Sequence, residues 1–355
     1  MFEKVNAGHP DKMADRLAGA VVDLVYERAG GLTKANPRVA CEVMAGHGRV
    51  DVQIETSLGR LDLRADDLDP LIHRLFGERV EGNVLIAPQD PHLSENQTCG
   101  LRSKTFESPD GTGDGVSQGQ RVMRCGDNGI FRGVPPTYEQ RVLTAIAATI
   151  YGSIPYDGKY IIGQAYDRWP NFDGGPDIME PILGGHDLTI CQSHATKDEI
   201  QDVLCEFFRK NGGLVVPTLH DRAQIGDDLY FFPERQINPL GPWTGGIDVD
   251  CGCTNRKLGS DMGDGVTGGG LMGKDLSKAD VSVNIVCYLK AVASGQVVTA
   301  CCSIGDEEVT FVYADGRRET ERFADIVEQA RLYIHTIGGF EKFAEWGLIR
   351  ANTDL

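Results

Sequence analysis

The sequence has few aromatic residues and no long apolar run, and each shortage excludes a class of protein. Only 7% of its 355 residues are aromatic, whereas 41% are hydrophobic and 25% are charged. No window approaches the roughly 18 consecutive apolar residues of a membrane-spanning helix, and the start MFEKVNAGHP contains no apolar core of signal-peptide length. This composition is typical of a soluble globular protein, and we expect a cytoplasmic one with no membrane partner.

Positive charge is also in deficit. Lys and Arg number 35 against 52 Asp and Glu, which gives a formal net charge of −17. A nucleic-acid partner is therefore not expected, because binding to a phosphate backbone needs a basic surface. The ten cysteines lack the paired C-x-x-C spacing of a structural zinc site, so we interpret them as mostly reduced, buried thiols.

Glycine, in contrast, is abundant, with 44 residues, and the glycine-rich stretches divide the chain. Residues 88–136 and 233–270 carry many Gly and Pro with little periodicity, which indicates long functional loops or domain connections. We therefore predict three domains over residues 1–100, 120–232 and 233–355.

Hydrophobic periodicity predicts helices and hairpin-like strands in each of these units. The expected helices start at Pro10, cover 139–151, follow Thr196, and cover 278–293 and 323–337. The expected strands cover 39–45, 49–56, 160–164, 187–193, 297–303 and 309–313. This mixture favours an α+β fold over the strict alternation of a parallel sheet.

The first polar cluster is Gly8-His9-Pro10-Asp11-Lys12. Proline is favoured at the first position of a helix, so the free N–H groups and positive dipole end of this helix face whatever lies in front of them. A phosphate suits that end, and Asp11 would then hold Mg²⁺, which prefers carboxylate and phosphate oxygens. The alternative is that His9 and Asp11 only cap a surface helix.

A second cluster, residues 248–257, ends in the adjacent pair Arg256 and Lys257. A planar guanidinium and a compact ammonium after a glycine-containing turn form a combination suited to phosphate. A solvated charge pair is the alternative interpretation.

A third cluster covers residues 268–280, with the sequence GGGLMGKDLSKAD. Lys274 and Lys278 lie four positions apart where a helix begins, and Asp280 is near enough in sequence to hold a metal beside them. The loop is not a Walker A motif, because Asp275 stands where that motif needs Ser or Thr.

Several weaker signals have a plain structural interpretation as well as a functional one. Residues 126–129 and 157–159 are turn sequences first. Glu42 and Glu55 lie on the polar sides of the predicted hairpin, where carboxylates usually face solvent. Trp243 is either a stacking platform in a site or a loop anchor.

The blocks follow the order of motifs in methionine adenosyltransferases, also called S-adenosylmethionine synthetases, and the chain resembles that family as a shortened and divergent member. The matching blocks are Gly8–Lys12, Ala40–Glu42, Gly126–Gly129, Asp157–Lys159, Asp250–Lys257 and Gly268–Asp280. They span most of the chain, and the first and last blocks are highly specific.

The resemblance implies three similar two-layer α/β-sandwich domains around a pseudo-threefold axis. It further implies S-adenosylmethionine synthesis from ATP and L-methionine, in which sulfur attacks ribose C5′ and the released triphosphate is hydrolysed to pyrophosphate and phosphate. The implied cofactors are Mg²⁺, as two ions, and K⁺. A homodimer or dimer of dimers with shared active sites is also implied.

Carried over by position, the resemblance implies a role for each motif residue. On the nucleotide it places His9, Asp157, Lys159, Trp243, Asp250, Arg256, Lys257 and Lys274. On methionine it places Glu55, Gln97, Asp127, Asp250 and Lys278. For the metals it places Asp11 and Asp280 on Mg²⁺ and Glu42 on K⁺. The catalytic set is His9, Lys159, Arg256, Lys257, Lys274 and Lys278.

Five further expectations concern this site. Trp243 takes the place of the family's adenine-stacking Phe, Asn255 replaces a Gly in the motif before Arg256, and Glu95 is an alternative to Gln97. His9 and Glu55 are expected from one subunit, with Lys274 and Asp250 from its partner. The segment 99–125, which should contain the gating loop, shows no match.

Two other classes of function remain open at this point. A catalytically silent regulatory homologue would keep the fold without turnover. Another Mg-dependent ATP-using enzyme, such as a kinase, would release ADP and would need a carboxylate aimed at an acceptor hydroxyl. The reaction products would distinguish the synthase, the silent homologue and the kinase from one another.

Overall fold

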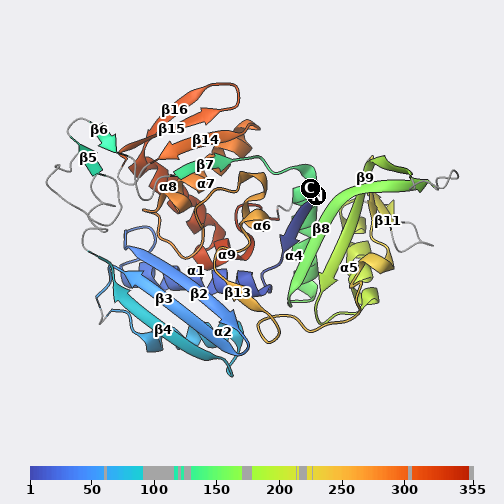
Figure 1. Cartoon of the computed structure of the whole chain (residues 1–355), viewed down its shortest axis with the longest axis horizontal. Coiled ribbons are helices and arrows are strands. Elements are labelled where there is room, and N and C mark those ends of the chain that lie inside the picture. The colour runs from blue at the N-terminus through green and yellow to red at the C-terminus, as the bar shows by residue number, and fades with distance from the viewer. Residues whose placement is uncertain are drawn as a thin grey trace. The chain divides into compact units, whose positions relative to one another are not determined.

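The structure is a computed structural model that describes residues 1–59, 62–90, 116–118, 121–123, 129–169, 178–212, 214–215, 222–225, 227–302 and 306–351 (Figure 1). Contacts divide the chain into two compact units. The first comprises Met1–His9, Thr137–Asp250 and Ile349–Leu355, and the second comprises Pro10–Pro136 and Cys251–Leu348. Within the described ranges, no helix combines the length and apolar character needed to cross a membrane.

The first unit is built on one six-stranded sheet. Its strand order is β1 (Phe2–Val5), β8 (Gly158–Trp169), β9 (Ile178–Gln192), β12 (Asp228–Phe231), β11 (Arg222–Ile225) and β10 (Leu214–Val215). Helix α4 (Tyr138–Ser153) packs against β1 and β8, while α5 (Lys197–Lys210) packs against α4, β10 and β11. Capping boxes at Thr137 and Thr196 start the two helices. The single-turn η3 (Glu234–Gln236) follows β12.

The second unit contains a four-stranded sheet in the order β13 (Cys251–Cys253), β2 (Val39–Gly46), β3 (Arg49–Thr56) and β4 (Glu81–Pro88). Buried and exposed residues alternate along β2 and β3, because one face of the sheet is covered and the other is not. Helix α1 (Pro10–Arg28) packs against β2 and β13 and also contacts α2 (Asp69–Phe76), which η1 (Ala65–Asp67) precedes.

A second four-stranded sheet of this unit has the order β16 (Arg318–Arg322), β15 (Glu308–Tyr313), β14 (Val298–Cys302) and β7 (Gly129–Gly133). Helix α7 (Ala279–Ser294) packs against β7 and β14, α8 (Phe323–Ile337) packs on α7, and α9 (Phe340–Trp346) packs on α1. Their core is apolar and includes Phe131, Val286, Val298, Phe311 and Ile326. The short α6 (Leu258–Met262), η4 (Gly263–Gly265) and the ladder β5 (Val116–Gln118) with β6 (Arg121–Met123) complete the described elements.

Each of the three large sheets takes an edge strand from a distant part of the sequence. Strand β1 pairs with β8, β7 pairs with β14, and β13 pairs with β2, all antiparallel (Figure 1). Strands therefore cross the three contiguous ranges predicted from composition. The predicted domain boundaries remain a prediction. None of the three large sheets is built from one continuous segment of the chain.

The α+β class is confirmed, and most predicted elements are present. The helix from Pro10 and the helix over 323–337 begin and end where the sequence indicates. The predicted hairpin turns through His47 and Gly48, both with positive φ of 52° and 77°. Lys278 is the N-cap of α7 and its side chain makes no capping hydrogen bond. The Ser277 N–H just before it donates to Asp275 Oδ1 at 2.8 Å.

Candidate active site

The turn that presents His9 is held by the buried side chain of Asn6. Asn6 Oδ1 accepts from Gly8 N at 2.9 Å and from Gly158 N at 3.2 Å. Gly8 approaches the next turn so closely that a Cβ there would lie 2.8 Å from the Tyr156 carbonyl carbon. His9, itself buried, donates its N–H to Asn6 O at 3.1 Å. The turn is therefore shaped by backbone and amide contacts, a signal that the sequence motif alone did not contain.

Asp157 and Trp243, both predicted on the nucleotide, lie together in the first unit. Asp157 is 6% exposed, and its Oδ2 accepts from Gly246 N at 3.0 Å. A Cβ at Gly245 would lie 2.7 Å from Asp157 and 2.8 Å from the Trp243 ring. Only glycine fits between the two side chains, so the Gly245-Gly246 turn brings the carboxylate and the indole to one place.

The indole of Trp243 is oriented by a residue that sequence reasoning missed. Trp243 Nε1 donates to Asn238 Oδ1 at 3.3 Å, and Trp243 O accepts from His194 N at 3.1 Å. Asn238 is buried and has φ of +41°, a conformation that asparagine tolerates better than most residues. The His194 ring stacks on Tyr156 at 4.4 Å. The first unit therefore offers two aromatic surfaces around its nucleotide candidates.

The two other predicted residues of this unit are more open. Lys159 is part-exposed on β8, and its Nζ lies 3.5 Å from Glu3 Oε2 on β1. Asp250 is exposed at the end of the glycine-rich turn, where its N–H donates to Gly246 O at 3.1 Å. Both side chains can reach a ligand without a change in the buried structure.

In the second unit, Asp11 joins the first helix to the second motif. Its Oδ1 accepts from Cys253 N at 2.9 Å, its Oδ2 lies 3.1 Å from Lys257 Nζ, and Arg256 Nε lies 3.6 Å from Oδ1. The Asp11 side chain is 2% exposed, whereas Arg256 is 56% exposed. The structure thus brings together three predicted residues, with the carboxylate beneath and the guanidinium toward solvent.

A buried ion cluster, missed by sequence reasoning, supports this arrangement. Lys12 Nζ bonds Asp261 Oδ1 at 2.7 Å and Asp15 Oδ2 at 3.1 Å, and none of the three side chains is exposed. Burial alone would lower the pKa of Lys12, but the two carboxylates outweigh it and the pKa is raised. Burial raises the pKa of Asp15 to about 7, although Lys12 opposes that shift.

Asp11 and Asp15 lie one helical turn apart on α1 and hold the same segment. Asp11 accepts from Cys253 N, and Asp15 Oδ1 accepts from Asn255 N at 2.8 Å. Residues four apart share a helix face, so Asp11 and Asp15 of α1 both accept from the segment before Arg256. The N–H groups that they bind belong to Cys253 and Asn255. The spacing Asp11-x-x-x-Asp15 was the available sequence signal.

The third cluster lies along the start of β2. Cys41 N donates to Gly273 O at 2.7 Å, and Asp275 N donates to Val39 O at 3.1 Å. Gly273 has φ of +78°, and a Cβ there would lie 2.1 Å from Cys41 O, so the close approach requires glycine. Asp275 Oδ2 accepts from Val39 N at 2.8 Å. An anchoring carboxylate thus occupies the position where a Walker A loop has a hydroxyl.

This extension places Lys274 next to Glu55 on one sheet face. Ala40 pairs with Lys274 on one side and with Glu55 on the other, so the two Cα atoms are about 10 Å apart, two strand spacings. The expected division, with Glu55 and Lys274 of one site on different subunits, remains a prediction, and within one chain the two residues lie near each other. Lys274 Nζ also lies 2.7 Å from Asp280 Oδ2.

Glu42 lies one row further along the same sheet face. Thr254 Oγ1 donates to Glu42 Oε2 in a short hydrogen bond. A hollow of about 290 Å³ lies over this face, lined by Glu42, Val43, Met44, Asp51, Val52, Gln53, Asn83, Leu85 and Cys253. Lys278 is half-buried at the start of α7, where its N–H donates to Asp275 O at 3.2 Å. Gln97, Glu95 and Asp127 lie outside the described residues, as does most of the expected gating segment 99–125.

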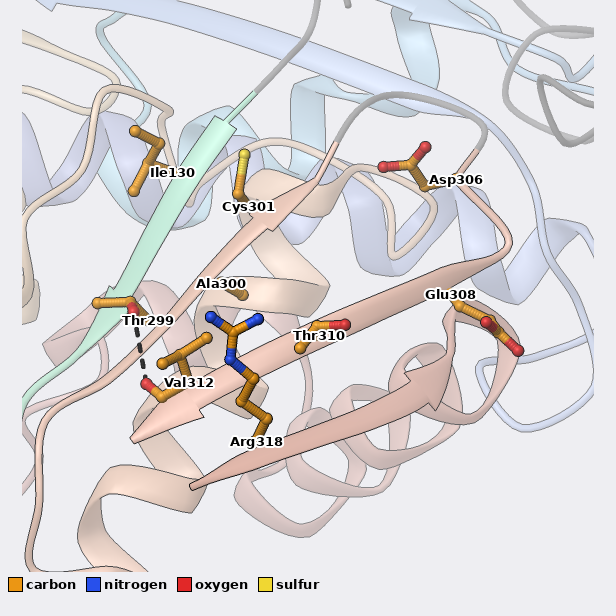
Figure 2. Close-up of a pocket in the computed structure, with 9 residues that line it drawn as sticks. All are labelled: Ile130, Thr299, Ala300, Cys301, Asp306, Glu308, Thr310, Val312 and Arg318. Atoms are coloured by element: carbon orange, nitrogen blue, oxygen red, sulfur yellow. Dashed lines mark hydrogen bonds between the residues drawn. The ribbon is translucent and has the colours of Figure 1, made fainter. Parts of the chain in front are cut away.

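Another hollow, of about 370 Å³, lies over the sheet of β7, β14, β15 and β16 (Figure 2). Figure 2 shows Arg318 reaching across β15 beside Thr310 and Val312, with Cys301 on β14 and Ile130 on β7 beyond it. The residues that line it are Ile130, Thr299, Ala300, Cys301, Asp306, Glu308, Thr310, Val312 and Arg318. None of them is a predicted site residue, so this hollow is separate from the candidate site.

The residues that could hold a metal are single carboxylates. No group of three or more His, Cys, Asp or Glu in the described part of the chain could hold a metal ion. Mg²⁺ is commonly bound through one or two carboxylates together with substrate phosphates. Asp11 and Asp280, each beside cationic side chains, fit that mode of binding better than an all-protein cage.

The chain is similar to several known proteins. No family model matches the chain. S-adenosylmethionine synthase of Nitratiruptor sp. is 25% identical over 331 residues, which cover 87% of this chain and 76% of the relative. S-adenosylmethionine synthase of Acidiphilium cryptum is 28% identical over 354 residues, covering 91% and 80%.

A solved structure has a similar fold. An unusual S-adenosylmethionine synthetase from Campylobacter jejuni superposes with a TM-score of 0.59, at 18% identity, over 98% of this chain and 93% of that one. The expected fold class and the resemblance read from the motifs are both confirmed. The chain is therefore a divergent relative of the S-adenosylmethionine synthases, with an α+β fold of the same kind.

Proposed function

We propose that this protein makes S-adenosylmethionine from ATP and L-methionine. The observation that carries the proposal is the position of Asp11 against Arg256 and Lys257, at 3.6 Å and 3.1 Å. A carboxylate suited to Mg²⁺ beside a guanidinium and an ammonium suited to phosphate forms half of a polyphosphate site. The specific reaction, S-adenosylmethionine synthesis, is inferred from the names of the similar proteins.

The chemistry needs little from an acid or a base. A neutral sulfur attacks ribose C5′, a sulfonium forms, and a polyanionic triphosphate leaves. Rate enhancement therefore comes mostly from groups that stabilise the departing charge. Arg256 offers a planar fork and Lys257 a compact charge, and Asp11 and Asp280 would hold Mg²⁺, which would neutralise further phosphate charge. Lys274 adds a third cation.

The first unit supplies the nucleoside contacts in this proposal. Trp243 stacks on adenine, with its ring held by Asn238. Asp157 contacts the nucleotide from the Gly245-Gly246 turn. His9 lies beside the ribose O5′, and the exposed end of Lys159 reaches phosphate.

Methionine and K⁺ take the remaining residues. Glu55 binds the methionine ammonium, Lys278 its carboxylate, and Glu42 holds K⁺ next to Thr254. Gln97, Asp127 and Asp250 complete the methionine side. The protein acts as a homodimer or dimer of dimers with shared sites, in which His9 and Glu55 come from one subunit and Lys274 and Asp250 from its partner.

Product analysis tests this function directly. The purified protein is incubated with ATP, methionine, Mg²⁺ and K⁺, and the products are identified by mass spectrometry and phosphate assays. S-adenosylmethionine with pyrophosphate and phosphate is the expected result. ADP would indicate a kinase, and no turnover would indicate a silent homologue.

A further inference from the structure

We propose that a buried network of side-chain amides in the first unit fixes the distance between the turn of His9 and the ring of Trp243, with Tyr160 as its central positioning residue. The inference rests on the proposed function, which assigns His9 to ribose O5′ and Trp243 to adenine. The network therefore sets the spacing between the groups that hold the two ends of the nucleoside.

At one end of the network, Asn6 shapes the turn that presents His9. Asn6 Oδ1 accepts from Gly8 N at 2.9 Å, and Asn6 O accepts from His9 N at 3.1 Å. Asn6 Nδ2 donates to Tyr160 Oη at 2.9 Å and to Gln192 Oε1 at 3.3 Å. Asn6, Tyr160 and Gln192 are fully buried. Because a buried polar group that loses its partner costs free energy, these bonds fix the orientation of the Asn6 amide.

At the other end, Asn238 orients the indole of Trp243. Asn238 Oδ1 accepts from Gln192 N at 2.8 Å and from Trp243 Nε1 at 3.3 Å. Asn238 Nδ2 donates to Gln192 O at 2.9 Å. The Asn238 side chain thus binds both backbone polar groups of Gln192, and the orientation of the indole follows the backbone at that residue.

The hydroxyl of Tyr160 joins the two halves of the network. It donates to Gln192 Oε1 at 2.5 Å and accepts from Asn6 Nδ2 at 2.9 Å. These three polar atoms converge on Gly158, since a Cβ there would lie 2.3, 2.4 and 2.6 Å from Gln192 Oε1, Tyr160 Oη and Asn6 Nδ2. A continuous path of hydrogen bonds therefore runs from the turn of His9 to the indole of Trp243.

The spacing of the two ends matters for one step of the proposed reaction and not for the next. Sulfur attack requires ribose C5′ to be aligned, and a misplacement of about 1 Å can lower a rate about 100-fold. Hydrolysis of the released triphosphate no longer involves the base. A loosened network should therefore slow adenosyl transfer and spare tripolyphosphate hydrolysis.

Tyr160→Phe tests this separation, because it removes the bridging hydroxyl and keeps the buried ring. Two activities of the full-length protein are measured with Mg²⁺ and K⁺, namely S-adenosylmethionine formation from ATP and methionine and hydrolysis of added tripolyphosphate. We expect kcat for S-adenosylmethionine formation to fall about 10- to 100-fold. The KM for methionine and the rate of tripolyphosphate hydrolysis should stay close to those of wild type.

A matched control and a double-mutant cycle identify the cause. Tyr230 is also fully buried, on β12 of the same sheet, where its ring stacks on His186 at 5.0 Å. Tyr230→Phe should leave both activities close to wild type. In a Trp243→Ala background, Tyr160→Phe should have little further effect on S-adenosylmethionine formation, because the spacing no longer matters once one end is lost.

Three results would overturn the inference and leave the proposed function intact. Tyr160→Phe could lower both activities equally, which indicates a general folding defect, or it could form S-adenosylmethionine at the wild-type rate. Its full effect could also persist in the Trp243→Ala background. A wild-type protein that forms no S-adenosylmethionine, or hydrolyses no tripolyphosphate, would instead overturn the proposed function.

Discussion

The side chain of Asn255 bonds both backbone polar groups of Met272. Asn255 Oδ1 accepts from Met272 N at 2.8 Å, and Asn255 Nδ2 donates to Met272 O at 3.2 Å. The residue has φ of +63°, where glycine is easiest and asparagine is the best-tolerated alternative. The replacement of the family's glycine therefore keeps the turn and adds a clamp between the Arg256-Lys257 turn and the loop that carries Lys274.

Removing this clamp should cost stability in two separable steps. Asn255→Gly keeps the backbone conformation and loses two hydrogen bonds, for about 1–2 kcal/mol. Asn255→Ala loses the same hydrogen bonds but keeps a Cβ in the left-handed region, so it should be about 1–2 kcal/mol less stable than the Gly variant. Urea unfolding of the three proteins measures both steps, and equal stability of the Gly and Ala variants would contradict the second.

Gly252 should tolerate no side chain. A Cβ there would lie 2.0 Å from Pro10 O, whereas nothing lies within 4 Å of one at Gly259. Gly252→Ala should therefore lower the free energy of unfolding by about 3 kcal/mol, at the upper end for overpacking. Gly259→Ala, in the nearby helix α6, should be neutral or stabilising by up to about 1 kcal/mol. If thermal unfolding gave both variants the same midpoint, the close approach of β13 to Pro10 would be wrong.

Asp15 should make stability depend on pH near neutrality. Burial raises its pKa from 3.8 to about 7 in the folded chain, with Lys12 and Asp261 as the charged groups that face it. The folded state therefore holds this proton more strongly than the unfolded state, so the contribution of Asp15 is fully present below pH 4 and is lost as pH rises to about 7. The slope is at most about 1.4 kcal/mol per pH unit.

Asp15→Asn provides the reference for this measurement. Urea unfolding of both proteins at pH 5 and pH 8 should show a larger advantage of wild type at pH 5. A constant difference across that range would mean that Asp15 titrates normally.

Trp243 should determine the affinity for ATP. Stacking is worth on the order of 1–3 kcal/mol per base, so Trp243→Ala should weaken ATP binding roughly ten- to hundredfold and Trp243→Phe only mildly. Equilibrium dialysis with labelled ATP measures both. Unchanged affinity in the Ala variant would assign adenine to the Tyr156–His194 stack instead, since that is the other aromatic surface nearby.

Shared sites should allow two inactive variants to complement each other. His9→Ala and Lys274→Ala should each be nearly inactive as homodimers if the two residues of one site come from different chains. Refolded together in equal amounts, they should recover roughly a quarter of wild-type activity, because half of the dimers are mixed and each of these has one intact site of two. Confirmed subunit exchange without recovery would show that His9 and Lys274 of one chain serve the same site.

Local chemistry made several elements readable from the sequence. Pro10 and the glycines at 30 and 31 bound α1, with φ of +113° and +103° at those glycines. The Thr196-x-x-Glu199 spacing starts α5 through bonds within four residues. Such signals need no distant partner. The motif blocks could also be identified from the sequence. They indicated the resemblance that the comparisons confirm.

The partners of those motifs were decided by the tertiary structure. Lys12 meets Asp261 from 249 positions away, and Asn6 meets Tyr160 and Gln192 from more than 150. Ala40 separates Glu55 from Lys274 only because residues 273–275 extend the sheet. Composition and periodicity describe which face of an element is buried, but they do not specify which remote segment covers it. Burial then determines the charge state, so the raised pKa of Asp15 and the ion pairs of Asp11 and Asp280 depend on contacts that no local pattern contains.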